Sequence, residues 1–233
     1  MTEPNRLPPG QYEIDAFPRF GLTRFAYRFP NDPGRIQLRI AGDVEQPESI
    51  RSELRDLVRI EQTSDFHCVT TWSKRSLHWS GFRFADFYER IVVPRARPQR
   101  DATLVILRAQ DGYAVSLPLA DLLAESVLLA DHLNGKPLTI EHGAPLRLIA
   151  PAHYGYKNAK HLCGIEFWRD DRMYRPAAFR FMDHPRARVA LEERGRWAPG
   201  WLLRRLYRPL IGSTVRQFQQ ALDKHSARSS APK

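Results

Sequence analysis

The stretch FHCVTTWSKRSLHWSGFRFADFY, residues 66–88, places one of the two cysteines of the chain between a histidine and a Val-Thr-Thr-Trp run. Phe66, Cys68 and Thr70 share one parity, so residues 60–72 fit a strand. Cys68 then has two interpretations. It is either a small apolar residue of a strand core, a common place for cysteine, or a thiolate presented to a soft metal.

The composition indicates a folded globular chain. Of 233 residues, 42% are hydrophobic and 27% are charged, which argues against disorder and allows one large domain or a domain with an appendage. The two cysteines, Cys68 and Cys163, exclude a disulfide framework but not a single bridge. Residues 1–21 show no apolar signal region, and no run approaches the ~20 apolar residues of a spanning helix. We therefore expect a cytoplasmic protein with no transmembrane segment.

The positive charge is concentrated in the C-terminal quarter. Residues 169–233 contain 15 Lys and Arg against 6 Asp and Glu, a net charge of +9 out of +10 for the chain. This asymmetry suggests that the segment meets something acidic, such as a membrane surface, a nucleic acid or a protein partner. The alternative is a solvated basic tail.

The hydrophobic pattern predicts an α+β fold, because strands and short helices mix without the regular alternation of a doubly wound sheet. Residues 1–34 are rich in Pro, Gly and aromatic residues and are interpreted as an extended arm. The predicted strands are 35–42, 60–72, 102–110, a short one before 119, 145–151 and 162–168. The predicted helices are 46–58, 80–92 and one beginning at about Leu119.

The sequence changes character beyond residue 184. Residues 184–197 could form a helix ended by Gly195, and residues 200–225 form a basic amphipathic segment that Pro209 and Gly212 should interrupt. Such a segment can lie on a membrane, dock on a partner or pack back on its own domain. Its predicted apolar face comprises Leu203, Leu206, Tyr207 and Leu210. We divide the chain into a domain at 1–183, including the arm, and a basic extension at 184–233.

Common catalytic motifs are absent. The sequence has no Gly-x-Gly-x-x-Gly, no Walker loop, no His-Glu-x-x-His, no Cys-x-x-Cys and no Gly-x-Ser-x-Gly. A hydrolase or a nucleotide-binding enzyme therefore has no support.

Five ordered elements between residues 66 and 168 carry a resemblance. They are the HCVTTWS run, the HWSGF turn, the NGKPL and HGAPLRL pair, the YGYKNAK loop and the HLCGIEF strand. Together they resemble the sulfite oxidase-like family of molybdopterin enzymes, which includes bacterial methionine sulfoxide reductase catalytic subunits. The resemblance implies a mixed, strand-rich fold and a molybdenum–molybdopterin cofactor.

The resemblance also implies roles for individual residues. Cys68 matches the family's metal-ligand position, and a thiolate suits a soft metal site. Trp72, Tyr154 and Tyr156 are candidates to shape the substrate site or donate protons, although Trp72 also fits a core position. Cys163 is interpreted as a core residue. The implied cofactor-binding residues are Arg24, Cys68, His142, Arg147, Gly155, Lys157, Asn158 and Lys160. The two lysines also fit the alternative of an exposed loop.

The implied activity is oxygen-atom transfer to or from a small-molecule oxo acceptor or donor. The chain has no His-Pro-Gly-Gly haem motif, so electrons must be exchanged with a separate partner, for which the basic extension is a candidate docking surface. Two alternatives remain: a cofactor-free binding module on the same fold, and a nucleic-acid binder driven by the basic tail. No base-reading module accompanies the tail, which disfavours the latter.

Overall fold

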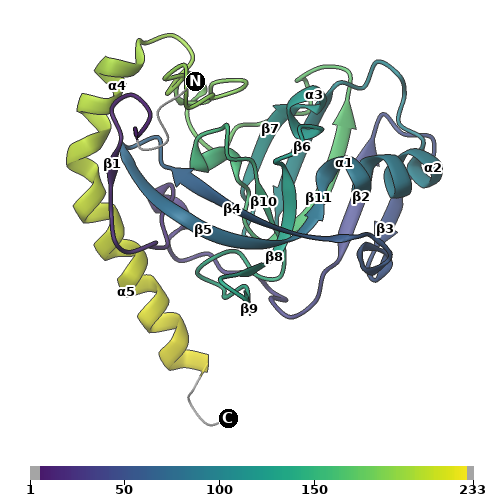
Figure 1. Ribbon diagram of the computed structural model, residues 1–233, viewed down its shortest axis with the longest axis horizontal. Helices are drawn as coiled ribbons and strands as arrows, with labels where there is room; N and C mark the ends of the chain where they lie inside the picture. Colours follow the sequence, from purple (N-terminus) through teal and green to yellow (C-terminus); the bar gives the residue numbers. More distant parts are fainter. Residues whose placement is uncertain (1–5, 230–233) are drawn as a thin grey trace.

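The computed structural model describes residues 6–229, which form two sheets packed against each other (Figure 1). The first sheet has the order β1-β5-β8-β10, with β4 paired to β5 and β9 to β8. Its strands are β1 (Tyr12–Glu13), β4 (Arg59–His67), β5 (Trp72–Arg83), β8 (Leu128–Leu133), β9 (Lys136–Pro137) and β10 (Arg147–Ile149). The second sheet, in spatial order, comprises β3 (Glu48–Ile50), β2 (Leu38–Gly42), β11 (Leu162–Trp168), β6 (Leu104–Ala109) and β7 (Ala114–Pro118).

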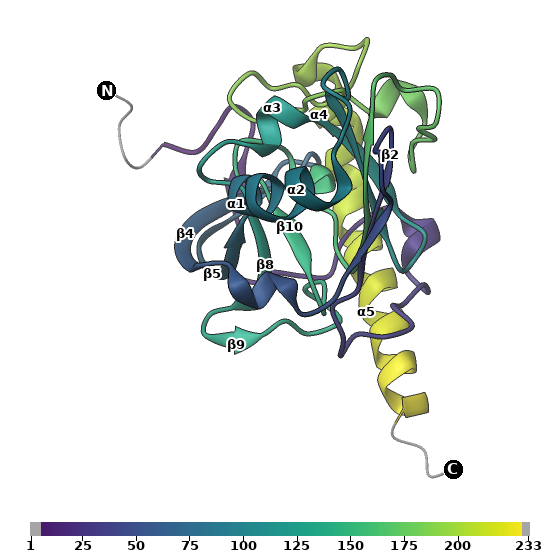
Figure 2. The same ribbon diagram turned by 90° about the vertical axis from the view of Figure 1, so that its right-hand side faces the viewer.

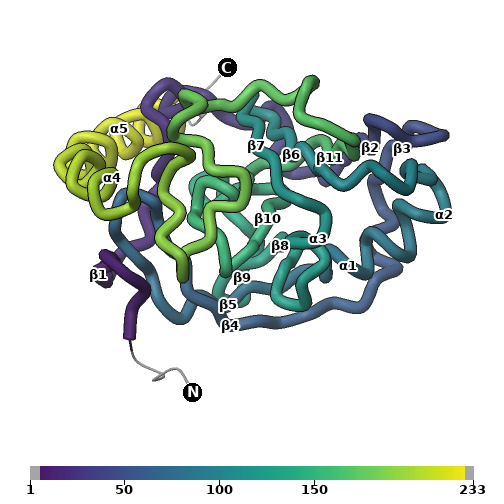
Figure 3. Tube along the Cα trace, turned by 90° about the horizontal axis from the view of Figure 1, so that it is seen from above, coloured from purple at the N-terminus to yellow at the C-terminus, as the bar shows by residue number. Residues whose placement is uncertain are grey.

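The helices lie mainly at two opposite ends of the molecule (Figures 1 and 3). At one end, α1 (Phe84–Phe87), a π-helical turn (Tyr88–Val92) and α2 (Val93–Ala96) follow one another without a break, in front of the two sheets in Figure 2. At the other end stand α4 (Gly200–Tyr207), the 3-10 turn η6 (Arg208–Leu210) and α5 (Ile211–Ser229). The short elements are α3 (Leu119–Leu122) and the 3-10 turns η1 (Thr23–Phe25), η2 (Glu53–Asp56), η4 (Gly155–Lys157) and η5 (Arg180–Met182).

The main core lies between the two sheets. This position explains why buried and exposed side chains alternate along the strands. In β2, Leu38 and Ile40 are fully buried whereas Arg39 is exposed, as the sequence pattern predicts. Phe84 and Phe87 of α1 are also fully buried, so the helix packs on the same core. The predicted α+β class is confirmed.

Two expected helices are wrong. Within 46–58 the chain instead forms β3, whose Ile50 pairs with Leu38 of β2, and then the short turn η2. The helix expected from Leu119 ends after one turn, and residues 128–133 form β8 between β5 and β10. Leu128, Leu129 and Ala130 are all fully buried there, and a continuous apolar run fits a central strand as well as a helix.

The C-terminal expectations also need correction. Residues 184–197 contain no helix, and a set of side-chain hydrogen bonds holds them in turns. Pro209 does not end the next helix; it tightens one turn into η6, and Gly212 lies inside α5. Leu203 and Tyr207 are buried as expected, but Leu206 and Leu210 are more than half exposed.

Helices α4 and α5 pack along the N-terminal arm (Figure 1). Phe218 and Ala221 of α5 are buried against Ala26, and the rings of Phe29 and His225 stack with centroids 3.9 Å apart. Within residues 6–229, no helix is long and apolar enough to cross a membrane.

Candidate functional site

One cavity of about 290 Å³ gathers most of the sequence-predicted site residues. Its walls include the N-terminal arm, the turn between β4 and β5, the turn between β6 and β7, the loop at 155–161, and helices α4 and α5. The predicted site residues that line it are Cys68, Trp72, Gly155, Tyr156, Asn158 and Lys160. The cavity therefore joins residues from both ends of the chain.

Cys68 lies in a tight turn, because β4 ends at His67 and β5 begins at Trp72. The Cys68 amide donates to the Trp72 carbonyl at 2.8 Å, and the Thr71 amide donates to the Cys68 carbonyl at 3.1 Å. Thr71 has a φ of +98°, which closes the turn. The strand expected over 60–72 is confirmed for residues 60–67 but not beyond, because a turn follows His67 and presents Cys68 at the cavity wall.

The Cys68 thiol is held in its neutral form by its surroundings. Burial raises the pKa of Cys68 to about 11, and a contact of 3.1 Å with the Thr70 hydroxyl opposes this shift, as do the charges of Arg194 and Lys160. A thiolate at this position needs a strong positive partner, and a bound metal ion is one.

Arg194, which sequence analysis did not single out, holds the Cys68 turn. The side chain is fully buried, and its Nη1 donates to the Val69 carbonyl at 2.6 Å. Its Nη2 donates to the Pro9 carbonyl at 3.0 Å, and its Nε to Glu192 at 3.2 Å. No sequence signal marks Arg194, because it stands among many arginines in an irregular segment.

Arg147 is a buried cation with unused donors. Its Nη1 donates to the His142 carbonyl at 2.7 Å, whereas its Nε and Nη2 have no partner within residues 6–229. The guanidinium lies 4.9 Å from the Trp79 ring and 5.7 Å from the Phe66 ring. Burial lowers the pKa of Arg147 to about 9.

Two further basic groups, Lys160 and His142, are affected by the charge of Arg147. Burial, together with the charges of Arg147 and Arg19, lowers the pKa of Lys160 to about 7. Burial, with the charges of Lys160 and Arg147, lowers the pKa of His142 to about 4. Mutually repelling basic groups with free donors are the arrangement expected around an anion.

A phosphorylated, planar heterocycle fits these residues. Unpartnered buried donors are present on Arg147 and on Trp72 Nε1, and His142 Nδ1 is a further unpartnered nitrogen. Gly155 has no room for a side chain, since a Cβ there would lie 2.2 Å from Phe66 Cζ. The ring of Phe17 stacks on His142 with centroids 5.1 Å apart.

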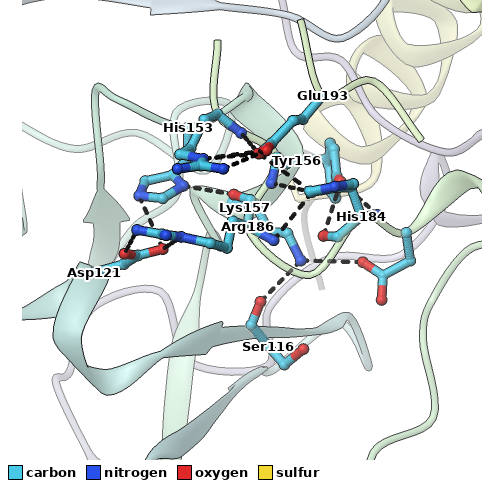
Figure 4. A network of polar contacts seen from close by, with 11 residues as sticks. Ser116, Asp121, His153, Tyr156, Lys157, His184, Arg186 and Glu193 are labelled. Carbon is cyan, nitrogen blue, oxygen red and sulfur yellow. Dashed lines mark hydrogen bonds and ion pairs between the residues drawn. The ribbon is translucent and has the colours of Figure 1, made fainter. Parts of the chain in front are cut away.

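Three of the predicted cofactor-binding residues make other contacts. Lys157 Nζ donates to the Ser116 carbonyl at 2.9 Å and to Asp183 at 3.1 Å, facing into the polar network of Figure 4. Burial lowers the pKa of Lys157 to about 8. Asn158 lines the cavity, but its Oδ1 accepts a hydrogen bond from the Ala150 amide. Arg24 donates to the Ala177 carbonyl and does not line the cavity.

The two predicted tyrosines differ in their hydroxyl contacts. Tyr156 lines the cavity, and its hydroxyl accepts a hydrogen bond from the His184 amide at 3.1 Å (Figure 4). Tyr154 is fully buried outside the cavity lining, with the Arg194 guanidinium 5.0 Å from its ring. The Trp72 ring is buried at the cavity wall, 5.8 Å from the Phe66 ring.

The site thus combines one cysteine on a cavity wall with buried basic groups, some of whose donors have no partner within residues 6–229. The chain belongs to the family described as the oxidoreductase molybdopterin-binding domain, whose profile matches residues 26–174. The resemblance inferred from the sequence is confirmed, and the protein is an oxidoreductase of a molybdopterin-binding family.

Individual relatives agree with this family. The chain is 38% identical over 167 residues to the uncharacterized oxidoreductase YuiH of Bacillus subtilis (strain 168), covering 71% of this chain and 81% of YuiH. It is 28% identical to the protein-methionine-sulfoxide reductase catalytic subunit MsrP of Xanthomonas campestris pv. campestris, over 67% of this chain but 56% of that relative. The sulfane dehydrogenase SoxCD of Paracoccus pantotrophus has a similar fold, with a TM-score of 0.52 at 19% identity, covering 65% of this chain and 43% of SoxCD.

Proposed function

We propose that this protein is a molybdenum–molybdopterin oxidoreductase that performs oxygen-atom transfer, with Cys68 as the protein ligand of the metal. The observation that carries the proposal is that Cys68 and Lys160 line one cavity, while Arg147, whose charge acts on Lys160, has buried donors without a partner within residues 6–229. A single thiolate suits a soft metal, and free cationic donors suit the phosphate of the pterin.

Different residues of the chain bind different parts of the cofactor. Arg147 and Lys160 supply positive charge for the phosphate, and Trp72 supplies a donor for the heterocycle. When bound, the cofactor supplies the two-electron redox chemistry of oxygen-atom transfer. The aromatic side chains of Phe17, Phe66 and Trp72 keep water away from the bound group.

A small sulfoxide is the first substrate to test. The name of the MsrP relative specifies reduction of methionine sulfoxide, and the family resemblance includes such enzymes. The expected assay result is oxidation of a reduced viologen dye that depends on both the sulfoxide and Cys68. A folded protein from a cofactor-competent host that contains no molybdopterin would contradict the proposal and favour a binding module.

The electrons are exchanged with a separate partner, and the outer face of α4 is its proposed docking surface. Trp201, Arg205 and Leu206 are exposed there, and residues 200–222 contain no Asp or Glu. Basic and apolar groups together fit a partner with an acidic rim around an apolar patch.

Point substitutions test docking better than truncation, because removing the C-terminal region would also remove Arg194, which holds the Cys68 turn. Arg205→Glu should slow turnover with the physiological electron partner and leave turnover with a small dye unchanged. Arg55→Glu, an exposed charge reversal beside β3, is the matched control. Equal effects of both variants, or a loss with the dye as well, would exclude docking on α4.

A further inference from the structure

The inner face of α4 and α5 forms a wall of the Cys68 cavity. The cavity-lining residues of these helices recur along one side of the continuous helical segment: Tyr207, Leu210, Thr214 and Phe218. All four lie beyond the family match at 26–174. The helices therefore do more than cover the arm, because they also contribute side chains to the site.

Tyr207 is the polar group of this wall that lacks a partner. Its side chain is 7% exposed, and its hydroxyl oxygen is buried with no hydrogen bond in the described part of the chain. The other two tyrosines that line the cavity are engaged. Tyr113 donates to the Tyr156 carbonyl at 2.7 Å, and Tyr156 is bonded to His184. An unpaired buried hydroxyl is unfavourable, so a ligand that bonds it is favoured.

Tyr207 lines the same cavity as Cys68. Arg194 bonds the carbonyl of Val69, the residue after Cys68. Arg194 thus holds the turn that brings Cys68 to the cavity that Tyr207 also lines.

The lining near Tyr207 is apolar, which restricts the substrate. Leu210, Phe218 and Phe20 contribute carbon surface. Arg19 also lines the cavity, but its guanidinium already donates to the backbone carbonyls of Ala26, Phe25 and Arg28. No arginine of the described lining is left for a small dianion such as sulfite, because Arg19 is the one arginine among these residues.

We propose that Tyr207 donates a hydrogen bond to the oxygen of a neutral, apolar-substituted oxo compound, such as an organic sulfoxide. This inference rests on the proposed function and specifies its substrate class. Tyr207 then distinguishes the oxygen-bearing form of the substrate from the form that has lost the oxygen. The apolar wall binds the carbon substituents of both forms equally.

The test compares Tyr207→Phe with wild type, using dimethyl-substituted or aryl sulfoxides and the matching sulfides on the cofactor-loaded protein. The substitution removes one oxygen atom, so molybdenum and pterin contents should not change. We expect kcat/KM for the sulfoxide to fall about tenfold, and the ratio of sulfoxide to sulfide affinity to fall equally. Tyr27→Phe, at an exposed tyrosine outside the cavity, should change neither.

Each other outcome has a distinct meaning. An unchanged affinity ratio, or equal losses for sulfoxide and sulfide, would overturn the assignment of Tyr207 while leaving the proposed function intact. Loss of molybdenum from Tyr207→Phe would also overturn it, by showing a role in holding the cofactor. Wild-type protein without molybdopterin would refute the proposed function, and the inference with it.

Discussion

Arg194 Nη1 lies 2.6 Å from the carbonyl oxygen of Val69, so a residue 125 positions further along the chain holds the turn that presents Cys68. Gln11 of the N-terminal arm also donates to the turn, to the Cys68 carbonyl at 3.1 Å. Segments outside the family match at 26–174 therefore fix the geometry of its cysteine. This relationship makes the C-terminal region part of the site.

Arg194→Met should loosen this turn. The variant loses three hydrogen bonds from a buried charged group, so we expect the free energy of unfolding to fall by about 3 kcal/mol. The molybdenum content should fall as well, measured on protein that remains folded. Arg204→Met is the control, since Arg204 contacts the same Glu192 carboxylate from a more exposed position and should change stability by less than about 1 kcal/mol. Full molybdenum occupancy in Arg194→Met would refute a positioning role.

Arg147→Met should lower cofactor binding without lowering the stability of the cofactor-free protein. An unpaired buried cation costs several kcal/mol, whereas the bond to the His142 carbonyl contributes about 1 kcal/mol. The cofactor-free variant is therefore expected to be at least as stable as wild type in chemical denaturation, and to retain little pterin. Arg97→Met, at an exposed surface pair, should retain the cofactor. A strongly destabilised Arg147→Met protein would show that the guanidinium is structural.

Lys160 should make anion binding dependent on pH. Its pKa of about 7 lies below the ordinary value of 10.5, so between these values the unfolded chain binds more protons. The contribution of Lys160 to the stability of the cofactor-free protein therefore rises with pH across this window. A bound phosphate raises the pKa again, so binding at pH 8 should take up a proton.

Titration calorimetry with inorganic phosphate, in two buffers of different ionisation enthalpy, measures this proton uptake. Lys160→Met should abolish most of it, while Lys136→Met, at an exposed lysine on β9, should preserve it. Equal uptake in wild type and Lys160→Met would assign the proton to another group.

Gly155→Ala should disturb the site through Phe66. A Cβ at residue 155 would lie 2.2 Å from Phe66 Cζ, and Phe66 stands two residues before Cys68. Overpacking of this kind costs about 1–3 kcal/mol and should lower cofactor occupancy. Thermal unfolding and pterin fluorescence measure the two effects. Gly34→Ala, where the nearest atom would be 3.7 Å away, should behave as wild type.

Strongly patterned elements could be predicted from the sequence. The strand at 162–168 has the predicted bounds, and Leu38 and Ile40 are buried as their alternation indicates. The cysteine motif and the loop at 154–160 were recognisable because their residue types recur in a fixed order. The structure brings Cys68 and Lys160 to one cavity.

Elements that depend on distant contacts could not be predicted. Ile50 has helical spacing with Leu54, but pairing with β2 decides its conformation. Residues 184–197 are held by ion pairs such as Arg188–Glu193, which no periodic pattern reveals. Tyr207 was placed on an apolar face, yet its unpartnered hydroxyl becomes visible only once the cavity is known.

Metal analysis of Cys68→Ser tests the central claim most directly. Wild type, Cys68→Ser and Cys163→Ser would be expressed in a molybdate-fed, cofactor-competent host, with pterin and molybdenum measured on folded protein. Cys163 lies on β11, where its thiol contacts the Arg108 carbonyl, so its serine variant is the matched control. We predict near-stoichiometric molybdenum in wild type and Cys163→Ser, and a lowered content or an altered Mo(V) spectrum in Cys68→Ser. Identical molybdenum content and spectra in all three proteins, or no molybdenum in any, would contradict the account.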